Sequence, residues 1–448
     1  MTHPFWTEIT TALALDETPF AEEGHGDLPS VYAVSDFASA TVAAAGTALA
    51  RLSGAGAERV VVDRRRASLW FEWSLKPQGW KMPSVWDPIA GNYAARDGFI
   101  RLHTNAPHHR AAALSVLRCD ATRDAVSDAV QDWTAEALED AVVTTGGCAA
   151  ALRSAADWRA HPQGQAIAKE PLVRWHDEDA CRPMPVSWAD DRPLAGLKVL
   201  DLTRVLAGPV ASRFLAGFGA DVLRIDPPHW SEPAAEAEVN LGKHCAGLDL
   251  RDAQDRATFE DLLKTADVVL HGYRPGALEG LGYGPEVRRK MNPGVVDVSL
   301  SAYGRNGPWG GRRGFDSLVQ MSCGIAAEGA RIAGRDTPLP LPVQALDHGT
   351  GYLLAATVLR GLDRRANGQT TQAELSLART AHCLMRAPGT LTPEAPITQD
   401  DRDFAPETEQ TGWGPARRMK PPLAVAGCAP NWAIPSNPVR SHAPRWAE

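Results

Sequence analysis

The sequence predicts an α/β fold built on a Rossmann-like, mostly parallel sheet, and two observations carry that prediction. Short apolar strands alternate with helical stretches between residues 191 and 385. Within that region, residues 193–226 (PLAGLKVLDLTRVLAGPVASRFLAGFGADVLRID) have the order strand, turn, helix, strand. Such alternation is typical of a parallel sheet with helices on both faces.

The expected elements follow one another along this region. Apolar strands are predicted in KVLDLT, ADVLRID, ADVVLHG and GVVDVSLS, and helices end at Phe218 and span about 255–265. A short strand then delivers Asp347 to the start of the apolar helix 349–362. A carboxylate at that position is either a helix cap or a nucleophile.

Length and composition predict further parts around this sheet. The chain has 448 residues, of which 44% are hydrophobic, which is more than one usual domain. We expect residues 1–190 to form a smaller α/β domain and 191–385 to form the Rossmann-like domain that contains the parallel sheet. The polar segment 176–193 predicts a linker. Residues 386–448 are rich in Pro, Thr and acidic side chains, and we expect an extended tail that wraps the protein or is partly disordered.

Charge and cysteine usage exclude several classes of protein. The net charge of −8 and the lack of long basic runs disfavour nucleic-acid binding. The seven cysteines are scattered and form no C-x-x-C pair, which indicates a reduced, cytoplasmic protein. We expect no export and no membrane span, because no basic leader and no run of about eighteen apolar residues exists.

Several motifs are absent. The first βα turn, T-R-V-L-A-G-P, lacks the G-x-G-x-x-G of dinucleotide binding. Neither the G-x-S-x-G elbow of serine hydrolases nor a metal-binding H-E-x-x-H occurs. We interpret His103, His108 and His109 as surface or hinge residues and expect no metal site.

Four blocks in order resemble the class III (formyl-CoA type) coenzyme A transferases over residues 193 to about 385. They are PLAGLKVLDLTRVLAGPVAS with GFGADVLRID, then NLGKHCAGLDLRD, ADVVLHGYRPGALEGLGYG and SLSAYGRNGPWGGRRGFDSLVQ. DGFIRLHTNAPHHRAAAL and GGCAAALRSAADWRAHPQG are similar to the family's smaller domain, which normally follows the catalytic segment. Here they precede it, so the chain resembles a rearranged or fused member.

The resemblance implies a mechanism and its substrates. Asp347 would attack an acyl-CoA, form an aspartyl-CoA thioester and pass coenzyme A to a small carboxylic acid. Asp316 would be an acidic neighbour of the reacting group or an ordinary helix cap. No cofactor would be permanently bound. The coenzyme would contact a set of residues at the strand ends: Arg204, Val205, Leu248, Arg251, Gly272, Tyr273 and Arg274.

Departures from the family keep two alternatives open. By resemblance, Phe315 occupies the position at which related acyl-CoA racemases have a His. The lack of this second base disfavours two-base proton transfer, but a racemase or isomerase stays an alternative. A non-catalytic CoA-binding relative is the other. Pro227 and Gly280 replace residues that are often basic, so the nucleotide end would be held more loosely or by other groups. The family forms interlocked homodimers, and we expect a homodimer here.

Two segments, near residues 30 and 340, resemble each other as a faint internal repeat. SVYAVSDFASATVAAAGTALARL and LPVQALDHGTGYLLAATVLRGL share a strand, a polar start and an Ala/Leu helix. In that alignment Ser35 falls opposite Asp347, which predicts a truncated, non-catalytic first copy.

Overall fold

A seven-stranded sheet forms the centre of the protein. The computed structural model describes residues 3–176, 180–184 and 192–447. The strand order is β10-β9-β8-β11-β12-β13-β7, parallel except for β7, which runs antiparallel to β13. The bounds are β7 (Arg174–Trp175), β8 (Lys198–Leu202), β9 (Asp221–Asp226), β10 (Lys243–Gly247), β11 (Val268–His271), β12 (Val296–Ser301) and β13 (Thr371–Ser376). The predicted mostly parallel sheet is confirmed.

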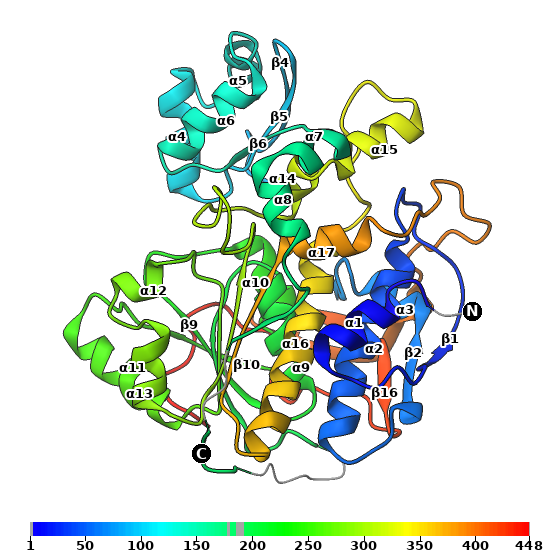
Figure 1. Ribbon diagram of the computed structural model, residues 1–448, viewed down its shortest axis with the longest axis vertical. Coiled ribbons are helices and arrows are strands. Elements are labelled where there is room, and N and C mark those ends of the chain that lie inside the picture. The colour runs from blue at the N-terminus through cyan, green and yellow to red at the C-terminus, as the bar shows by residue number, and fades with distance from the viewer. Residues whose placement is uncertain (1–2, 177–179, 185–191, 448) are drawn as a thin grey trace.

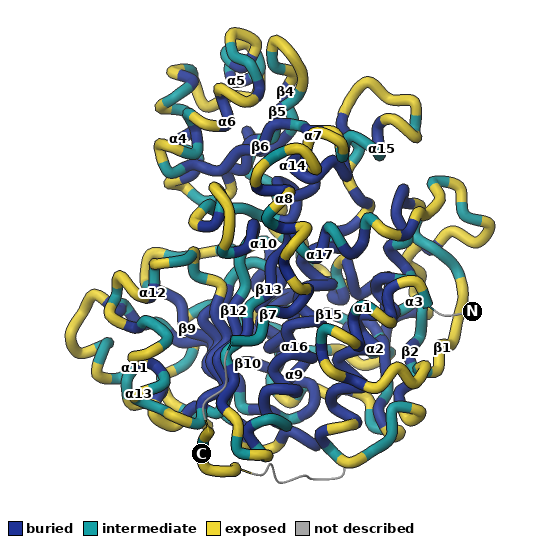
Figure 2. Tube along the Cα trace, viewed as in Figure 1, coloured by how far each residue is buried: buried dark blue, intermediate teal, exposed yellow. Residues whose placement is uncertain are grey.

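Helices cover both faces of the sheet, because successive strand residues are buried on opposite sides. Val199 and Val222 belong to the core that contains α9 and α16, whereas Leu200 and Leu223 pack with residues of α11. Figure 2 shows these strands as buried along their length. The helices of this region are α9 (Ala207–Gly217), α10 (Pro233–Val239), α11 (Ala253–Thr265), α12 (Ala277–Gly280), α13 (Pro285–Met291), α14 (Asp316–Ser322), α15 (Ile325–Ala333), α16 (Ala345–Ala366) and α17 (Leu377–Leu384).

The order in which strands are added to the sheet reverses between β8 and β11, which are parallel neighbours. From β8 the sheet grows outward through β9 to β10, and the chain then returns to add β11 on the other side of β8. In open α/β sheets, ligands bind outside the carboxyl ends of the strands at such a point. The sheet therefore offers a binding crevice at the ends of β8 and β11.

The elements that precede β7 in the chain contribute to two regions of the protein, the helices around α16 and a separate small sheet. Helix α2 (Val34–Leu52) lies beside α16, and α16 also packs against α9 (Figure 1). A separate three-stranded sheet, β4 (Gly91–Ala95), β5 (Gly98–Leu102) and β6 (Ala149–Ala151), lies at the top of that view with its own helices. The other elements are α1 (Trp6–Leu13), β1 (Ala21–Glu23), η1 (Ala57–Arg59), β2 (Val60–Asp63), α3 (Arg64–Leu69), β3 (Leu75–Pro77), α4 (Pro107–Leu117), α5 (Arg123–Val130), α6 (Ala135–Thr144), α7 (Ala155–Ala160) and α8 (Pro162–Ala168).

The C-terminal segment wraps the protein and adds strands to two small sheets. β15 (Gly414–Met419) lies between β14 (Phe404–Thr411) and β3, and β16 (Leu423–Val425) pairs with β2; a short turn, η2 (Asp401–Asp403), precedes β14. Farther on, the His442 N–H donates to the Cys245 carbonyl on edge strand β10, at 2.8 Å. The wrapping path agrees with the expected tail, but regular strands replace part of its extended chain.

The predicted domain division at residues 190 and 385 stays a prediction. β7, which precedes residue 190, pairs with β13 of the large sheet. The predicted linker 176–193 lies largely outside the described residues. No helix within the described ranges is long and apolar enough to cross a membrane.

Candidate active site

Asp347 lies in the first turn of α16 and does not cap it. The cap residue is Gln344, and Asp347 is the third residue of the helix. Its side chain is 7% exposed and has no hydrogen-bond or ion-pair partner among the described residues. The cap alternative for Asp347 is therefore wrong, because other groups accept the first N–H bonds of this helix.

Asp316, at the start of α14, supplies the missing cap from another element. Its Oδ2 accepts the backbone N–H groups of Leu346 at 2.9 Å and of Asp347 at 3.0 Å. Its Oδ1 accepts from Gln320 Nε2 at 2.5 Å. These bonds satisfy donors that a helix start leaves unpaired, and they hold two carboxyl groups side by side.

Burial controls the protonation of this pair. Loss of solvent raises the pKa of Asp316 to about 6, although Gln320 and the two backbone N–H groups act in the opposite direction. Burial and then the charge of Asp316 raise the pKa of Asp347 well above its ordinary value. Because like charges repel, ionisation of Asp316 disfavours ionisation of Asp347.

The structure brings Arg204 and Tyr273 together at the reversal between β8 and β11. Arg204 Nη2 donates to the Tyr273 hydroxyl at 3.0 Å. The guanidinium lies 4.6 Å from the Trp230 ring centroid and 4.9 Å from that of Tyr273, with Nε 3.7 Å from Asp226 Oδ1. This arrangement fixes a cation at the carboxyl ends of the strands, where an anionic ligand would bind.

Val205, next to Arg204, adopts a left-handed backbone. Its φ of 67° is uncommon for a β-branched residue, and its N–H donates to Glu232 Oε2 at 2.9 Å. Strain of this kind concentrates at binding and catalytic sites. The turn after β8 is therefore held in an unusual shape by its neighbours.

The other predicted coenzyme contacts are spread along the same edge. Leu248 is buried just after β10, whereas Gly272 and Arg274 are exposed after β11. Arg251 is exposed, but its guanidinium donates to both carboxylate oxygens of Asp249, at 2.8 and 2.7 Å. Arg251 would have to exchange that partner to bind a phosphate.

Two histidines that we interpreted as surface or hinge residues are buried. His103 is 6% exposed and His109 is 3% exposed, and burial lowers the pKa of each to about 3. Both were misassigned because the segment around them looks polar, yet His103 directly follows β5 and His109 lies on the buried side of α4. The His103 ring stacks on Phe315, with ring centroids 3.7 Å apart and planes 2° apart. A neutral imidazole therefore lies one residue from Asp316.

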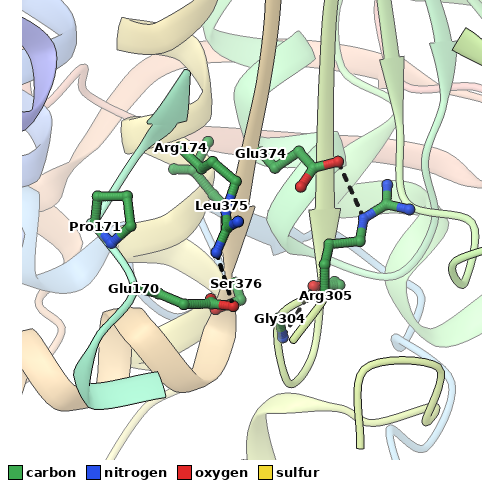
Figure 3. Close-up of a pocket in the computed structure, with 9 residues that line it drawn as sticks. Glu170, Pro171, Arg174, Gly304, Arg305, Glu374, Leu375 and Ser376 are labelled. Atoms are coloured by element: carbon green, nitrogen blue, oxygen red, sulfur yellow. Dashed lines mark hydrogen bonds and ion pairs between the residues drawn. The ribbon is translucent and has the colours of Figure 1, made fainter. Parts of the chain in front are cut away.

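A separate polar pocket of about 240 Å³ opens at the ends of β12 and β13. Figure 3 shows its two ion pairs, Arg174 with Glu170 and Arg305 with Glu374, at 3.2 and 3.1 Å. None of the predicted site residues lines it. Because its cations are already paired, the pocket offers no free charge to a ligand.

The backbone corrects the alignment of the internal repeat. The residues before α2 and α16 have nearly the same dihedral angles, φ −72° and ψ 65° at Ala33 and φ −78° and ψ 62° at Gln344. Superposing these helix starts places Asp36, not Ser35, opposite Asp347. Asp36 Oδ1 accepts from Arg64 Nη1 at 2.9 Å, so the first carboxylate is paired with a cation whereas Asp347 is not.

Comparisons with known proteins concern mainly the region that carries Asp316 and Asp347. Residues 194–413 match the family model described as CoA-transferase family III. An acyl-CoA transferase of Gibberella moniliformis is 32% identical over 55% of this chain and 46% of its own length. A succinyl-CoA:glutarate CoA-transferase of Mus musculus is 30% identical over 39% of this chain and 42% of its own length.

A solved structure, a hypothetical protein from Mycobacterium tuberculosis, has 34% identity and a TM-score of 0.39, covering 42% of this chain and 56% of that one. The chain thus matches less than half the length of the two curated relatives described above. Through residues 194–413, which hold both Asp316 and Asp347, this chain belongs to CoA-transferase family III.

Proposed function

We propose that this chain moves coenzyme A from an acyl-CoA to a small carboxylic acid, with Asp347 as the nucleophile. The observation that carries the proposal is the Asp347 carboxyl itself, which is buried and unpaired at a helix start that Asp316 already caps. Burying such a group without a partner is costly, so a reactive role explains it better than a structural one. Family membership supports the same chemistry.

The first half of the reaction loads coenzyme A onto the protein. The Asp347 carboxylate attacks the thioester carbonyl, which forms a mixed anhydride and releases the coenzyme A thiolate. The thiolate then attacks the aspartyl carbonyl carbon of that anhydride. This step forms the aspartyl-CoA thioester and releases the donor acid as its carboxylate.

The second half reverses these steps with the acceptor. The acceptor carboxylate attacks the aspartyl thioester, and the thiolate leaves; attack by the thiolate on the acceptor's carbonyl then gives the new acyl-CoA and restores Asp347. Asp316 assists by holding the backbone of Leu346 and Asp347 in place.

We place the coenzyme along the carboxyl ends of β8, β10 and β11. Arg204 and Arg274 would meet the phosphates, with Tyr273, Gly272 and Val205 beside the pantetheine. At the nucleotide end, Leu248 would provide an apolar contact and Arg251 a phosphate contact after leaving Asp249. Coenzyme A acts here as substrate. The homodimer and the cytoplasmic location stay predictions.

The test is to trap the covalent intermediate. The protein is incubated with a panel of acyl-CoAs, treated with hydroxylamine, digested and mapped by peptide mass. We expect an aspartyl hydroxamate on the peptide that contains Asp347, and transfer that falls by at least about 10⁴-fold in Asp347→Asn. Asp36→Asn is the matched control and should react like the wild type. Normal turnover in Asp347→Asn would refute the assignment.

A further inference from the structure

The last part of the C-terminal segment lies along edge strand β10. Two hydrogen bonds join them: the His442 N–H donates to the Cys245 carbonyl at 2.8 Å, and the Cys245 N–H donates to His442 Nδ1 at 3.1 Å. Two residues earlier, Arg440 adopts a left-handed backbone with a φ of 62°. Its side chain lies over Gly247, the last residue of β10, where a Cβ would come within 2.9 Å of the arginine Cγ and Cδ. Arg440 is thus seated at the carboxyl end of the strand.

The guanidinium of Arg440 holds the loop that joins β9 to α10. Its Nη1 donates to the Pro227 carbonyl at 3.3 Å and also to the Trp230 carbonyl. Both carbonyls belong to one turn, because the Trp230 N–H donates to the Pro227 carbonyl at 3.0 Å. A hydrogen bond from a charged donor is stronger than one from a neutral donor. The end of the chain therefore fixes this turn, although the arginine itself is exposed.

The same turn carries the groups that orient Arg204. The Trp230 ring centroid lies 4.6 Å from the Arg204 guanidinium. Trp230 Nε1 donates to Glu232 Oε2 at 3.1 Å, and that oxygen also accepts the Val205 N–H at 2.9 Å. Trp230 therefore contacts both the cation at the sheet edge and the partner of the strained turn after β8. Each step from Arg440 to Arg204 is a direct contact, first to the tryptophan backbone and then from its ring.

We propose, resting on the function proposed above, that Arg440 is a positioning residue for coenzyme A that acts through Trp230. By holding the Trp230 carbonyl, Arg440 keeps the indole ring over Arg204 and so keeps that guanidinium preorganised for the phosphates. Without Arg440 the turn loses its anchor, and the coenzyme has to order the turn when it binds. The C-terminal segment is then part of the binding edge as well as a cover for β10.

The first experiment measures coenzyme A affinity by calorimetry in the full-length protein. We expect Arg440→Met to bind coenzyme A about 5- to 10-fold more weakly than the wild type, and to raise KM for an acyl-CoA while kcat stays within about 2-fold. Arg402→Met is the matched control, because Arg402 is an exposed arginine of the same segment that lies 3.6 Å from Asp400. This control should match the wild type. Unchanged affinity in Arg440→Met would overturn the proposal.

A double-mutant cycle separates positioning from direct contact with the coenzyme. In a Trp230→Leu background the ring through which Arg440 acts is gone, so adding Arg440→Met should change the affinity by less than about 2-fold. The same loss in both backgrounds would show that Arg440 contacts the coenzyme itself or acts through its charge alone, which would contradict the proposal. The thermal midpoint of Arg440→Met should stay within about 2 °C of the wild type, because the side chain is exposed. A clear decrease would identify a general structural role instead.

Amide hydrogen exchange provides a measurement that is independent of binding and turnover. The Val205 N–H is bonded to Glu232, whose other partner is Trp230 Nε1, so exchange in peptides that span Val205 should be at least about 3-fold faster in Arg440→Met. Exchange at Leu346, whose N–H Asp316 accepts, should stay unchanged. An unaffected Val205 amide would refute the positioning role. Faster exchange in a protein that binds no coenzyme A would support the positioning of this turn and count against the proposed function alone.

Discussion

Replacement of Asp316 by Asn should make the protein more stable at alkaline pH than at acid pH, relative to the wild type. Burial raises the pKa of Asp316 from an ordinary 3.8 to about 6, so the folded chain binds this proton more tightly than the unfolded chain. Folding stability therefore falls as the pH rises through this window. A difference of about two pKa units corresponds to about 3 kcal/mol in the free energy of unfolding.

Asn retains an oxygen that can accept the N–H groups of Leu346 and Asp347, so the cap is largely kept while the titration is lost. Urea unfolding of both proteins at pH 4 and pH 8 measures the effect. The stability of Asp316→Asn relative to the wild type should increase by about 3 kcal/mol between these pH values.

Asp249→Asn is the control for this experiment. Its carboxyl has a pKa lowered to about 2, first by hydrogen bonding to Arg251, so its contribution has the opposite sign. Parallel pH profiles for the wild type and Asp316→Asn would show that burial does not raise the pKa of Asp316.

Three more predictions concern the coenzyme, the alternative chemistry and the first repeat copy. Arg204→Ala should weaken coenzyme A binding by about 10-fold or more in calorimetry, because it removes a preorganised cation. Unchanged affinity would show that the coenzyme does not bind at this edge of the sheet. The wild type should not exchange the α-proton of a 2-methylacyl-CoA in deuterated water, since Phe315 cannot relay one. NMR-detected exchange that disappears in His103→Gln would assign proton transfer to the buried histidine instead. Arg64→Met should lower the free energy of unfolding by about 1 to 2 kcal/mol without creating a hydroxamate at Asp36, and a label there would show a second reactive carboxylate.

The sequence predicted local features well and long-range packing poorly. Strands β8 to β12 follow from apolar runs between helices, and the Asp316 and Asp347 blocks follow from family-like order. The inward position of His103 could not be predicted, because it depends on a strand that packs against a helix more than 200 residues later. Nor could the pairing of Arg251 with Asp249, since a surface arginine looks the same in sequence whether it is free or bound.

The alignment of the repeat failed for a different reason. Ala-rich helices such as α2 carry almost no information about register, because shifting them by one residue leaves their composition unchanged. The backbone turn at Ala33 and Gln344 determines the register, and such a turn has no clear sequence signature.

The matched starts of α2 and α16 also affect which substitutions this protein can accept. In a symmetric pair of identical chains, every substitution appears at both equivalent positions, so a reactive carboxylate cannot be given up on one side alone. Here the two positions are encoded separately. Asp36 forms an ion pair with Arg64 whereas Asp347 is unpaired, so the two equivalent helix starts of one chain give their carboxyl groups different surroundings.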